Sequence, residues 1–342
     1  MTRIRTALLV AALLAVAVFT VAASAGKPGN GASTGQGRVF FPNPVATLQD
    51  QSLTDQKDED YAALQPAYRD VTLTNLDGSG TLSGDYANIR NETGDNAYSA
   101  TNQFLYGRSD DRFEQVMGYY WVTETQKYFQ ALGFGTGKRF APVNEESQDL
   151  RINQWGADNS YSWDKHDIIR MGKGGVDDAE DAEVIVHEYG HAVHDAQRVD
   201  LQGVEAGGIG EGFGDYLAVT VTNYISPTPD APCVADWDAV SYTSTVPHCL
   251  RRIDTAAHYP ESLSATSVHR NGLIWSASLW DIQKAIGRVA ADTTILEAHF
   301  SMGVVTNMPS AAGVIVDTAK RLYGDAVAAQ VRGAFEARGV LG

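Results

Sequence analysis

A short motif with two histidines constrains this chain more than any other feature of its sequence. Residues 184–194 read VIVHEYGHAVH, in a chain of 342 residues that contains only eight histidines. On a helix, His187 and His191 are four positions apart and project from the same face, where both imidazoles can hold one metal ion. Glu188 lies one position further round, where its carboxylate can accept a proton from a water molecule at the metal. The motif therefore predicts a helix that carries part of a zinc site.

A zinc site with an open position needs a third protein ligand, and the sequence offers one in the segment GGIGEGFGDYLAV. Glu211 and Asp215 are four positions apart there, so that Glu211 can complete the ligand set and Asp215 can accept the outer N–H of a ligating histidine. A surface acidic pair is the alternative in a chain with 42 acidic residues. The apolar neighbours of the pair instead predict a buried helix, where unpaired carboxylates are costly. His194, close behind His191, is expected to be an ordinary helix residue.

The pattern along the chain predicts an α+β fold. Residues 38–110 contain short β-like runs separated by Gly, Asn and Asp, whereas helical periodicity begins at Asp111 and continues to a stop at Gly133. The segment after Asp178 is mostly helical, so a β-rich first half precedes a helical second half. The stretch NLDGSG has no acidic residue at the twelfth position that a calcium loop requires, and it is expected to be a turn.

The N-terminus predicts export from the cell. Two early arginines, an apolar run and the sequence Ala-Ser-Ala make residues 1–25 a secretory signal peptide, with no membrane anchor after its removal. The Gly-rich residues 26–37 are expected to form a flexible linker. A net charge of −16 argues against nucleic acid or an anionic membrane surface as a partner.

The chain has two cysteines, Cys233 and Cys249. In an oxidising compartment we expect them to form one disulfide. A pair of metal ligands is the alternative, but neither cysteine has the neighbours that zinc sites use.

The motifs described above resemble the gluzincin metallopeptidases of the thermolysin and fungalysin branch (families M4 and M36). HEYGH is followed by EAGGIGEGFGDYLA, and CLRRIDTAAHYP and SVHRNGLIWSASLWDI resemble the later active-site segments of that branch. The resemblance covers roughly residues 110–290. It implies a thermolysin-like fold, in which the zinc helix lies between a β-containing N-terminal lobe and a mainly helical C-terminal lobe. Residues 111–342 would then be the catalytic domain, with the lobes meeting near residue 196.

The resemblance also implies the roles of the residues around the metal. It makes His187, His191 and Glu211 the zinc ligands and Glu188 the general base, and it places Asp215 beside His187 as a supporting partner. One zinc ion is therefore expected. Calcium is left open, because the calcium-binding segments of the family have no clear match.

Three further residues are implied to contact the substrate. His269 matches a histidine that stabilises the oxyanion of the tetrahedral intermediate, Arg251 matches an arginine that holds a substrate carbonyl, and Asn159 is a weaker match to an asparagine that binds the peptide main chain. Simpler roles stay open. Arg251 could form an ion pair with an acid within the fold, and His269 could be a core residue whose hydrogen bonds are satisfied. The family's tyrosine between the second histidine and the glutamate ligand has no counterpart in DAQRVDLQGVEAGG, so His269 would carry more of the stabilisation.

These features predict a secreted zinc metallopeptidase that hydrolyses peptide bonds in proteins or peptides and acts as a monomer. The alternative is a non-catalytic secreted binding protein with a structural zinc ion. Structural zinc sites close all four positions with protein ligands, which disfavours that alternative. The long propeptide of such peptidases has no counterpart in the roughly eighty residues between the signal peptide and the Asp111 helix.

Overall fold

A computed structural model describes residues 33–91, 93–137, 139–154 and 156–342. The expected signal peptide and the first part of the expected linker lie outside these residues. The last part of that linker does not behave as predicted, because Ser33–Gly37 belong to the first strand and pair with the second. The Gly-rich composition suggested flexibility, but strand pairing over residues 33–40 overrides it.

The N-terminal lobe contains two sheets. Their strands pair in the orders β2-β1-β4 and β3-β5-β7-β6. In the first sheet β1 is antiparallel to β2 and parallel to β4, and in the second only β6 runs antiparallel to its neighbour. The strands are β1 (Ser33–Phe40), β2 (Tyr68–Leu76), β3 (Ala87–Asn91), β4 (Gln103–Phe104), β5 (Gln148–Ile152), β6 (Tyr161–Trp163) and β7 (Ile168–Arg170).

The predicted helix after Asp111 is present as α2 (Phe113–Ala131), and Gly133 follows it with a φ of 101°. Helix α2 packs against both sheets. The backbone N–H of Phe40 in β1 donates a hydrogen bond of 3.1 Å to Sδ of Met117, and Gly118 faces the side chains of Leu150 and Ile152 in β5. Strands β3 and β5 pair directly, although α2 separates them in the sequence. This sheet therefore contains residues from both sides of position 110. Residues 38–110 are therefore built into the same structure as the segment that follows them.

The C-terminal half is mainly helical, as the sequence predicted. Its helices are α3 (Ala182–Ala196), α4 (Gly203–Ile225), α5 (Val268–Ile286), α6 (Arg288–His299), α7 (Met308–Tyr323) and α8 (Asp325–Ala337). Smaller elements are α1 (Pro44–Leu48), the antiparallel pair β9 (Cys233–Val234) and β10 (Arg251–Arg252), the parallel pair β8 (Asp200–Leu201) and β11 (Val304–Val305), and 3-10 turns at Ala62–Ala67, Asp164–His166, Asp178–Glu180 and Asp238–Ser241.

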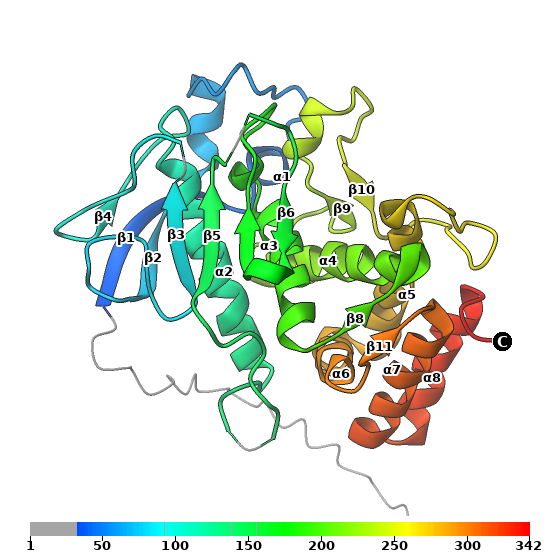
Figure 1. Cartoon of the computed structure of the whole chain (residues 1–342). Helices are drawn as coiled ribbons and strands as arrows, with labels where there is room; N and C mark the ends of the chain where they lie inside the picture. The colour runs from blue at the N-terminus through cyan, green and yellow to red at the C-terminus, as the bar shows by residue number, and fades with distance from the viewer. Residues whose placement is uncertain (1–32, 92, 138, 155) are drawn as a thin grey trace, which may run out of the picture.

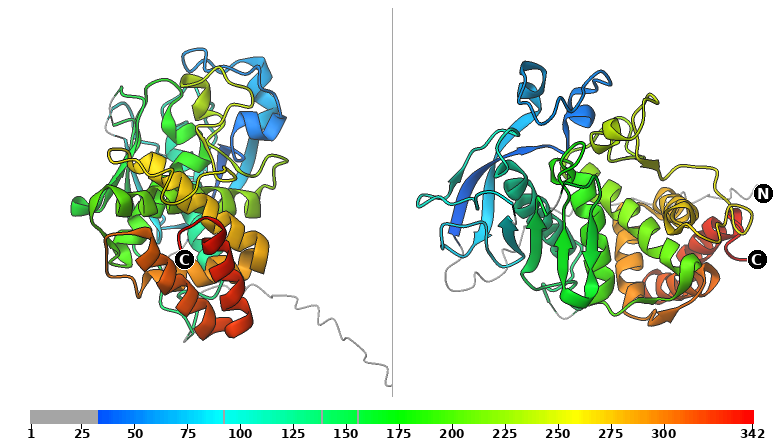
Figure 2. Two further views of the ribbon diagram at one scale, coloured as in Figure 1. Left: turned by 90° about the vertical axis from the view of Figure 1, so that its right-hand side faces the viewer. Right: turned by 45° about the horizontal axis from the view of Figure 1, so that its top comes forward.

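Helices α3 and α4 lie between the sheets and the remaining C-terminal helices (Figures 1 and 2). Asp181 begins α3 by accepting a hydrogen bond from the backbone N–H of Glu183, as acidic N-caps do. The apolar side chains of α4 around Glu211 and Asp215 are buried, namely Ile209, Phe213, Tyr216, Leu217 and Val219, which confirms the buried helix expected there. No helix among the described residues is long and apolar enough to cross a membrane.

Candidate metal centre

The two motif segments meet because α3 and α4 approach each other closely at glycine residues. A Cβ atom on Gly214 would lie 2.8 Å from Nδ1 of His187, and a Cβ atom on Gly190 would lie 3.0 Å from the Cα of Gly214. The first distance is too short for a Cβ atom, and the second is tight. Glycine at these positions therefore gives the imidazole of His187 the room to turn toward α4.

Three potential metal ligands converge at this contact. The ligand atoms of His187, His191 and Glu211 all lie within 4.8 Å of one another. Nε2 of His187 is 3.5 Å from Oε2 of Glu211, and Nε2 of His191 is 3.9 Å from Oε1. Ligands of a tetrahedral zinc ion at about 2.1 Å lie about 3.4 Å apart, so these separations fit a zinc ion.

The carboxylate of Glu211 is suited to bind a cation. Its Oε2 is buried and lies among imidazole nitrogens, 3.5 Å from Nε2 of His187 and 3.2 Å from Nε2 of His269, without the geometry of a hydrogen bond to any described residue. Burial alone would raise the pKa of Glu211, but the neighbouring His187 and His191 lower it to about 2. The group therefore stays ionised, and a charged buried oxygen without a hydrogen bond favours a metal ion as its partner.

Asp215 lies behind His187, as the sequence suggested. Its Oδ1 is 2.9 Å from Nδ1 of His187, and its two oxygens accept hydrogen bonds of 2.8 Å from Nε and Nη2 of Arg251. Although burial opposes ionisation of Asp215, Arg251 and His187 hold its pKa well below the usual range. This arrangement directs the Nε2 atom of His187 toward Glu211.

Glu188 is positioned beside the ligands and is 7% exposed. Its Oε2 atom is buried and has no hydrogen-bond partner among the described residues. The carboxylate is therefore available to accept a proton from a reactant bound at this place.

A cavity of about 70 Å³ opens beside these groups and is lined in part by Asn159, Arg251 and His269. The side chain of His269 is 60% exposed, so it is not a satisfied core residue, and its Nε2 lies 3.2 Å from Oε2 of Glu211. The sequence left open that Arg251 pairs with an acid within the fold. The structure shows such an ion pair, between Arg251 and Asp215. The structure thus gathers all the residues that the resemblance implied.

Three acidic residues in the lining of this cavity were missed by the sequence analysis, namely Asp178, Glu183 and Asp238. Asp158 lies close to Asp178 and Asp238, whereas the carboxylate of Glu183 accepts hydrogen bonds from Thr222 and Ala235. Asp178 begins the 3-10 turn Asp178–Glu180 ahead of α3, whereas Asp238 comes from a turn far along the chain, so no local spacing connects them. The acidic run VDDAED, which contains Asp178, can be recognised in the sequence. Its proximity to Asp238 cannot.

His194 takes no part in this centre. It is buried, its ring stacks on Phe213 with centroids 4.5 Å apart, and its Nε2 lies 3.4 Å from Nε2 of His299. Burial lowers the pKa of His194 well below its usual value. It is the ordinary helix residue that the sequence predicted.

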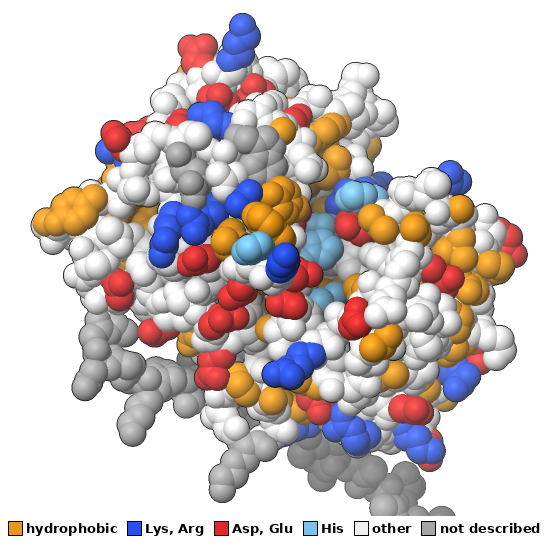
Figure 3. Space-filling model, in the orientation of Figure 1, with side chains coloured by type: hydrophobic (Ala, Val, Ile, Leu, Met, Phe, Trp, Pro, Cys, Tyr) orange, Lys and Arg blue, Asp and Glu red, His pale blue; other side chains and the backbone are white. Residues whose placement is uncertain are grey.

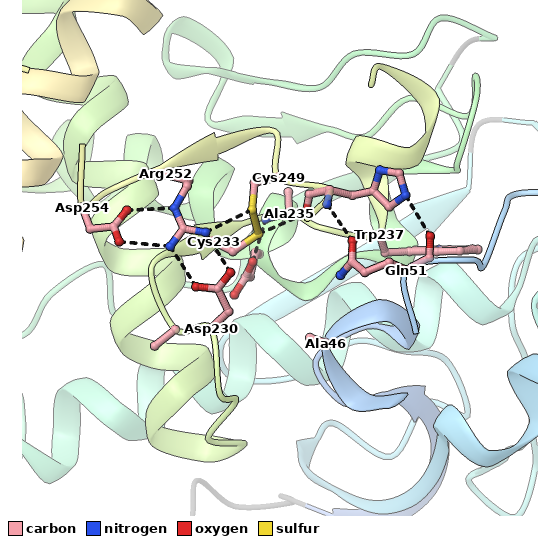
Figure 4. The surroundings of a disulfide bond; sticks show 12 residues. Ala46, Gln51, Asp230, Cys233, Ala235, Trp237, Cys249, Arg252 and Asp254 are labelled. Atoms are coloured by element: carbon pink, nitrogen blue, oxygen red, sulfur yellow. Dashed lines mark hydrogen bonds and ion pairs between the residues drawn. A yellow bond between two sulfur atoms is a disulfide. The ribbon is translucent and has the colours of Figure 1, made fainter. Parts of the chain in front are cut away.

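The predicted disulfide between Cys233 and Cys249 is present (Figure 4). It joins β9 to the segment just before β10. Arg252 of β10 binds Asp230 on one side and Asp254 on the other. The bridge therefore fixes the short strand that carries the neighbouring Arg251.

Figure 3 shows pale-blue histidine side chains in a hollow near the middle of one face, with acidic side chains around it. The candidate centre is reached from outside, because the side chains of His191 and His269 are 23% and 60% exposed.

The chain is similar to metallopeptidases of known families. A sequence model of the fungalysin metallopeptidase (M36) matches residues 74–340. Extracellular metalloproteinase 4 of Arthroderma gypseum is 25% identical over an alignment of 196 residues, and the match covers 47% of this chain and 30% of that protein. Extracellular metalloproteinase MEP of Fusarium vanettenii is 26% identical over an alignment of 144 residues, and the match covers 36% of this chain and 21% of that protein. The chain thus spans less than a third of the length of these curated relatives.

A solved structure has the same fold. The precursor of protealysin, a metalloproteinase from Serratia proteamaculans, superposes with a TM-score of 0.56 at 14% sequence identity, covering 75% of this chain and 87% of that one. This likeness confirms the predicted α+β fold of the thermolysin type.

Proposed function

The chain belongs to the fungalysin metallopeptidase (M36) family, and from this premise we propose that it is a secreted zinc metallopeptidase that hydrolyses peptide bonds. The observation that carries the proposal is the convergence of His187, His191 and Glu211 within 4.8 Å beside an open cavity. Three protein ligands with an accessible fourth position are typical of catalytic zinc sites.

A zinc ion bound by these three residues would polarise the substrate carbonyl and make a water molecule more acidic. The protein supplies the rest. Asp215 holds the imidazole of His187 with Nε2 toward the ligand set, and the ionised Glu211 contributes the negative charge that stabilises a divalent cation.

Glu188 is the general base in this proposal. Its buried Oε2 accepts no hydrogen bond from the part of the chain that the structure describes, so it can take a proton from the attacking water and later deliver it to the leaving amine. Both transfers require a carboxylate next to the reacting atoms, and Glu188 follows the ligand His187 directly on α3.

His269 and Arg251 contact the substrate in this proposal. The exposed imidazole of His269 reaches to within 3.2 Å of Glu211, where a hydrogen-bond donor can stabilise a developing oxyanion. Nε and Nη2 of Arg251 donate hydrogen bonds to Asp215. Its Nη1 donates to no residue that the structure describes, so this nitrogen can donate to a substrate carbonyl. Asn159 lines the same cavity and supplies a polar group for the peptide main chain.

Secretion is supported by the signal-peptide features of residues 1–25 and by the extracellular relatives. The second candidate is a non-catalytic binding protein with a structural zinc ion. Oε2 of Glu188, which has no hydrogen-bond partner among the described residues, disfavours it, because a purely structural site has no use for a buried carboxylate oxygen left without a donor beside the ligands.

The test is hydrolysis of casein by the purified exported protein. We expect cleavage that a chelator stops and that one equivalent of zinc restores. A zinc-loaded, folded protein that leaves casein and a broad peptide library intact would contradict the proposal and favour the binding protein.

A further inference from the structure

The cavity beside Glu188 has an acidic wall. Asp178 and Asp238 line it, with exposed fractions of 2% and 3%. Asp158 lies next to them, so that one oxygen atom from each of the three carboxylates is within 4.8 Å of the other two. Three carboxyl groups thus lie together, and two of them are buried.

The hydrogen bonds of these carboxylates are incomplete. Asp158 accepts a bond of 2.7 Å from the hydroxyl of Tyr242, and one oxygen of Asp178 accepts from the hydroxyl of Ser160. The Oδ1 atoms of Asp178 and Asp238 are buried and accept no hydrogen bond from any described residue. Burying a carboxylate oxygen without a hydrogen-bond donor costs folding free energy. A cation that bound these oxygens would remove that cost.

The nearby cation does not fill that role. Arg251 also lines the cavity, but its guanidinium forms a bidentate ion pair with Asp215. Burial raises the pKa of Asp178 to about 7, and the charge of Asp158 acts in the same direction. Both facts agree with a carboxyl cluster that has no cationic partner of its own among the described residues.

We propose that this cavity receives the basic side chain, lysine or arginine, of a substrate residue next to the scissile bond. The proposal rests on the proposed peptidase function. The cavity adjoins Glu188 and His269, so a side chain that enters it belongs to a residue close to the reacting carbonyl. Its other wall is apolar, with Val184, Val234 and Leu250, which suits the methylene stem of a lysine whose charged end meets the carboxylates.

A substrate ammonium fits this place better than a second metal ion. An ammonium group has three donors, and the cluster offers two orphan oxygens together with Asp158. Calcium takes six to eight oxygen ligands, and two of the carboxylate oxygens here already accept hydroxyl hydrogen bonds.

The experiment compares peptides that differ at one position beside the cleaved bond. Cleavage of a peptide library, read by mass spectrometry, is expected to show Lys and Arg enriched on one side of the bond. For matched Lys and Leu peptides, the ratio of their kcat/KM values should fall by about 10-fold or more in Asp178→Asn and in Asp238→Asn, as expected when one partner of a buried charge pair is lost. Asp158→Asn gives a third, independent variant.

Asp177→Asn is the matched control. Asp177 is also buried, with 3% exposure, and precedes Asp178 directly, but it does not line the cavity. Its replacement should leave the Lys-to-Leu ratio unchanged. Binding of the same two peptides to zinc-loaded Glu188→Gln protein gives a readout that does not depend on turnover, and melting curves show that each variant is folded.

Three results would overturn the proposal. The first is cleavage of the library, or binding by Glu188→Gln, without preference for Lys or Arg. The second is an unchanged ratio in the folded double variant Asp178→Asn/Asp238→Asn. The third is elemental analysis that finds a second divalent ion per chain, lost in Asp178→Asn, which would make the cluster a metal site. Failure of the peptidase function looks different, because then no peptide is cleaved at all.

Discussion

Asp215 contacts His187 and Arg251 at the same time. One carboxylate oxygen lies 2.9 Å from Nδ1 of the histidine, and both oxygens accept hydrogen bonds of 2.8 Å from the arginine. The carboxylate is fully buried on α4, between the zinc helix α3 and the short strand β10. A single residue therefore sets the orientation of a proposed ligand and the position of a proposed substrate-binding group.

This arrangement separates the roles of Glu211 and Asp215. Glu211→Gln removes a charged oxygen from the ligand set and should weaken zinc binding severely. Asp215→Asn keeps all three ligands and should cost about 10- to 100-fold in zinc affinity, the usual range for a group that supports a ligand. Competitive zinc titration of both variants beside the parent measures the order, and the reverse order would make Asp215 the ligand.

Glu188→Gln tests the general base. The amide keeps the shape of the side chain and leaves His187, His191 and Glu211 in place, so zinc content should remain near one ion per chain. Hydrolysis should fall by about 10²- to 10⁴-fold, the range for loss of a positioned base. Turnover equal to that of the parent, at equal zinc content, would remove Glu188 from the mechanism.

Gly214→Ala tests the close approach of the two helices. The added methyl group would lie 2.8 Å from Nδ1 of His187 and should push the ring away from Glu211. We expect weaker zinc binding, although alanine is the better helix former. Gly313→Ala on α7 is the control, because nothing lies within 4 Å of the added atom, and it should stabilise the fold by about 0.5–1 kcal/mol without changing zinc affinity. Equal zinc affinity in both variants would contradict the packing argument.

The disulfide should contribute measurably to stability. Cys233 and Cys249 are 16 residues apart, and a loop of that length corresponds to about 3 kcal/mol in the chain-entropy description. Both thiols should resist alkylation in the native protein and become labelled after reduction, with a lower melting temperature. Labelling of both cysteines without a reductant would show that the bridge does not form.

Asp177→Asn should stabilise the protein in a way that depends on pH. Burial and the nearby charge of Glu180 raise the pKa of Asp177 to about 8, whereas the unfolded chain releases this proton near pH 4. Between these values the unfolded state binds fewer protons at this group, so the parent loses stability as the pH rises from about 4 to about 8.

The variant has no such proton to lose. Its melting temperature should therefore match that of the parent near pH 4 and exceed it by a few degrees near pH 8. Asp317→Asn, at an exposed position on α7, should show no such trend. A difference between Asp177→Asn and the parent that is flat across this pH range would contradict the assignment.

The sequence by itself determined the local parts of the candidate site. Four-residue spacing places His187 beside His191 and Glu211 beside Asp215 wherever these segments are helical, because the α-helix repeats every 3.6 residues. The same periodicity predicted α2, and the cysteine pair predicted the disulfide. The end of the expected linker was wrong, since strand pairing with a distant segment decided the structure of Ser33–Gly37.

Only the tertiary structure decided which of these local faces meet. Gly214 and Gly190 bring α4 to α3, so that Glu211 lies near the histidines. The ion pair of Arg251 with Asp215 and the approach of Asp178 to Asp238 join segments far apart in the chain. Such contacts depend on how helices and turns pack against one another, and the backbone periodicity that is legible in a sequence carries no information about the distance between two separate elements.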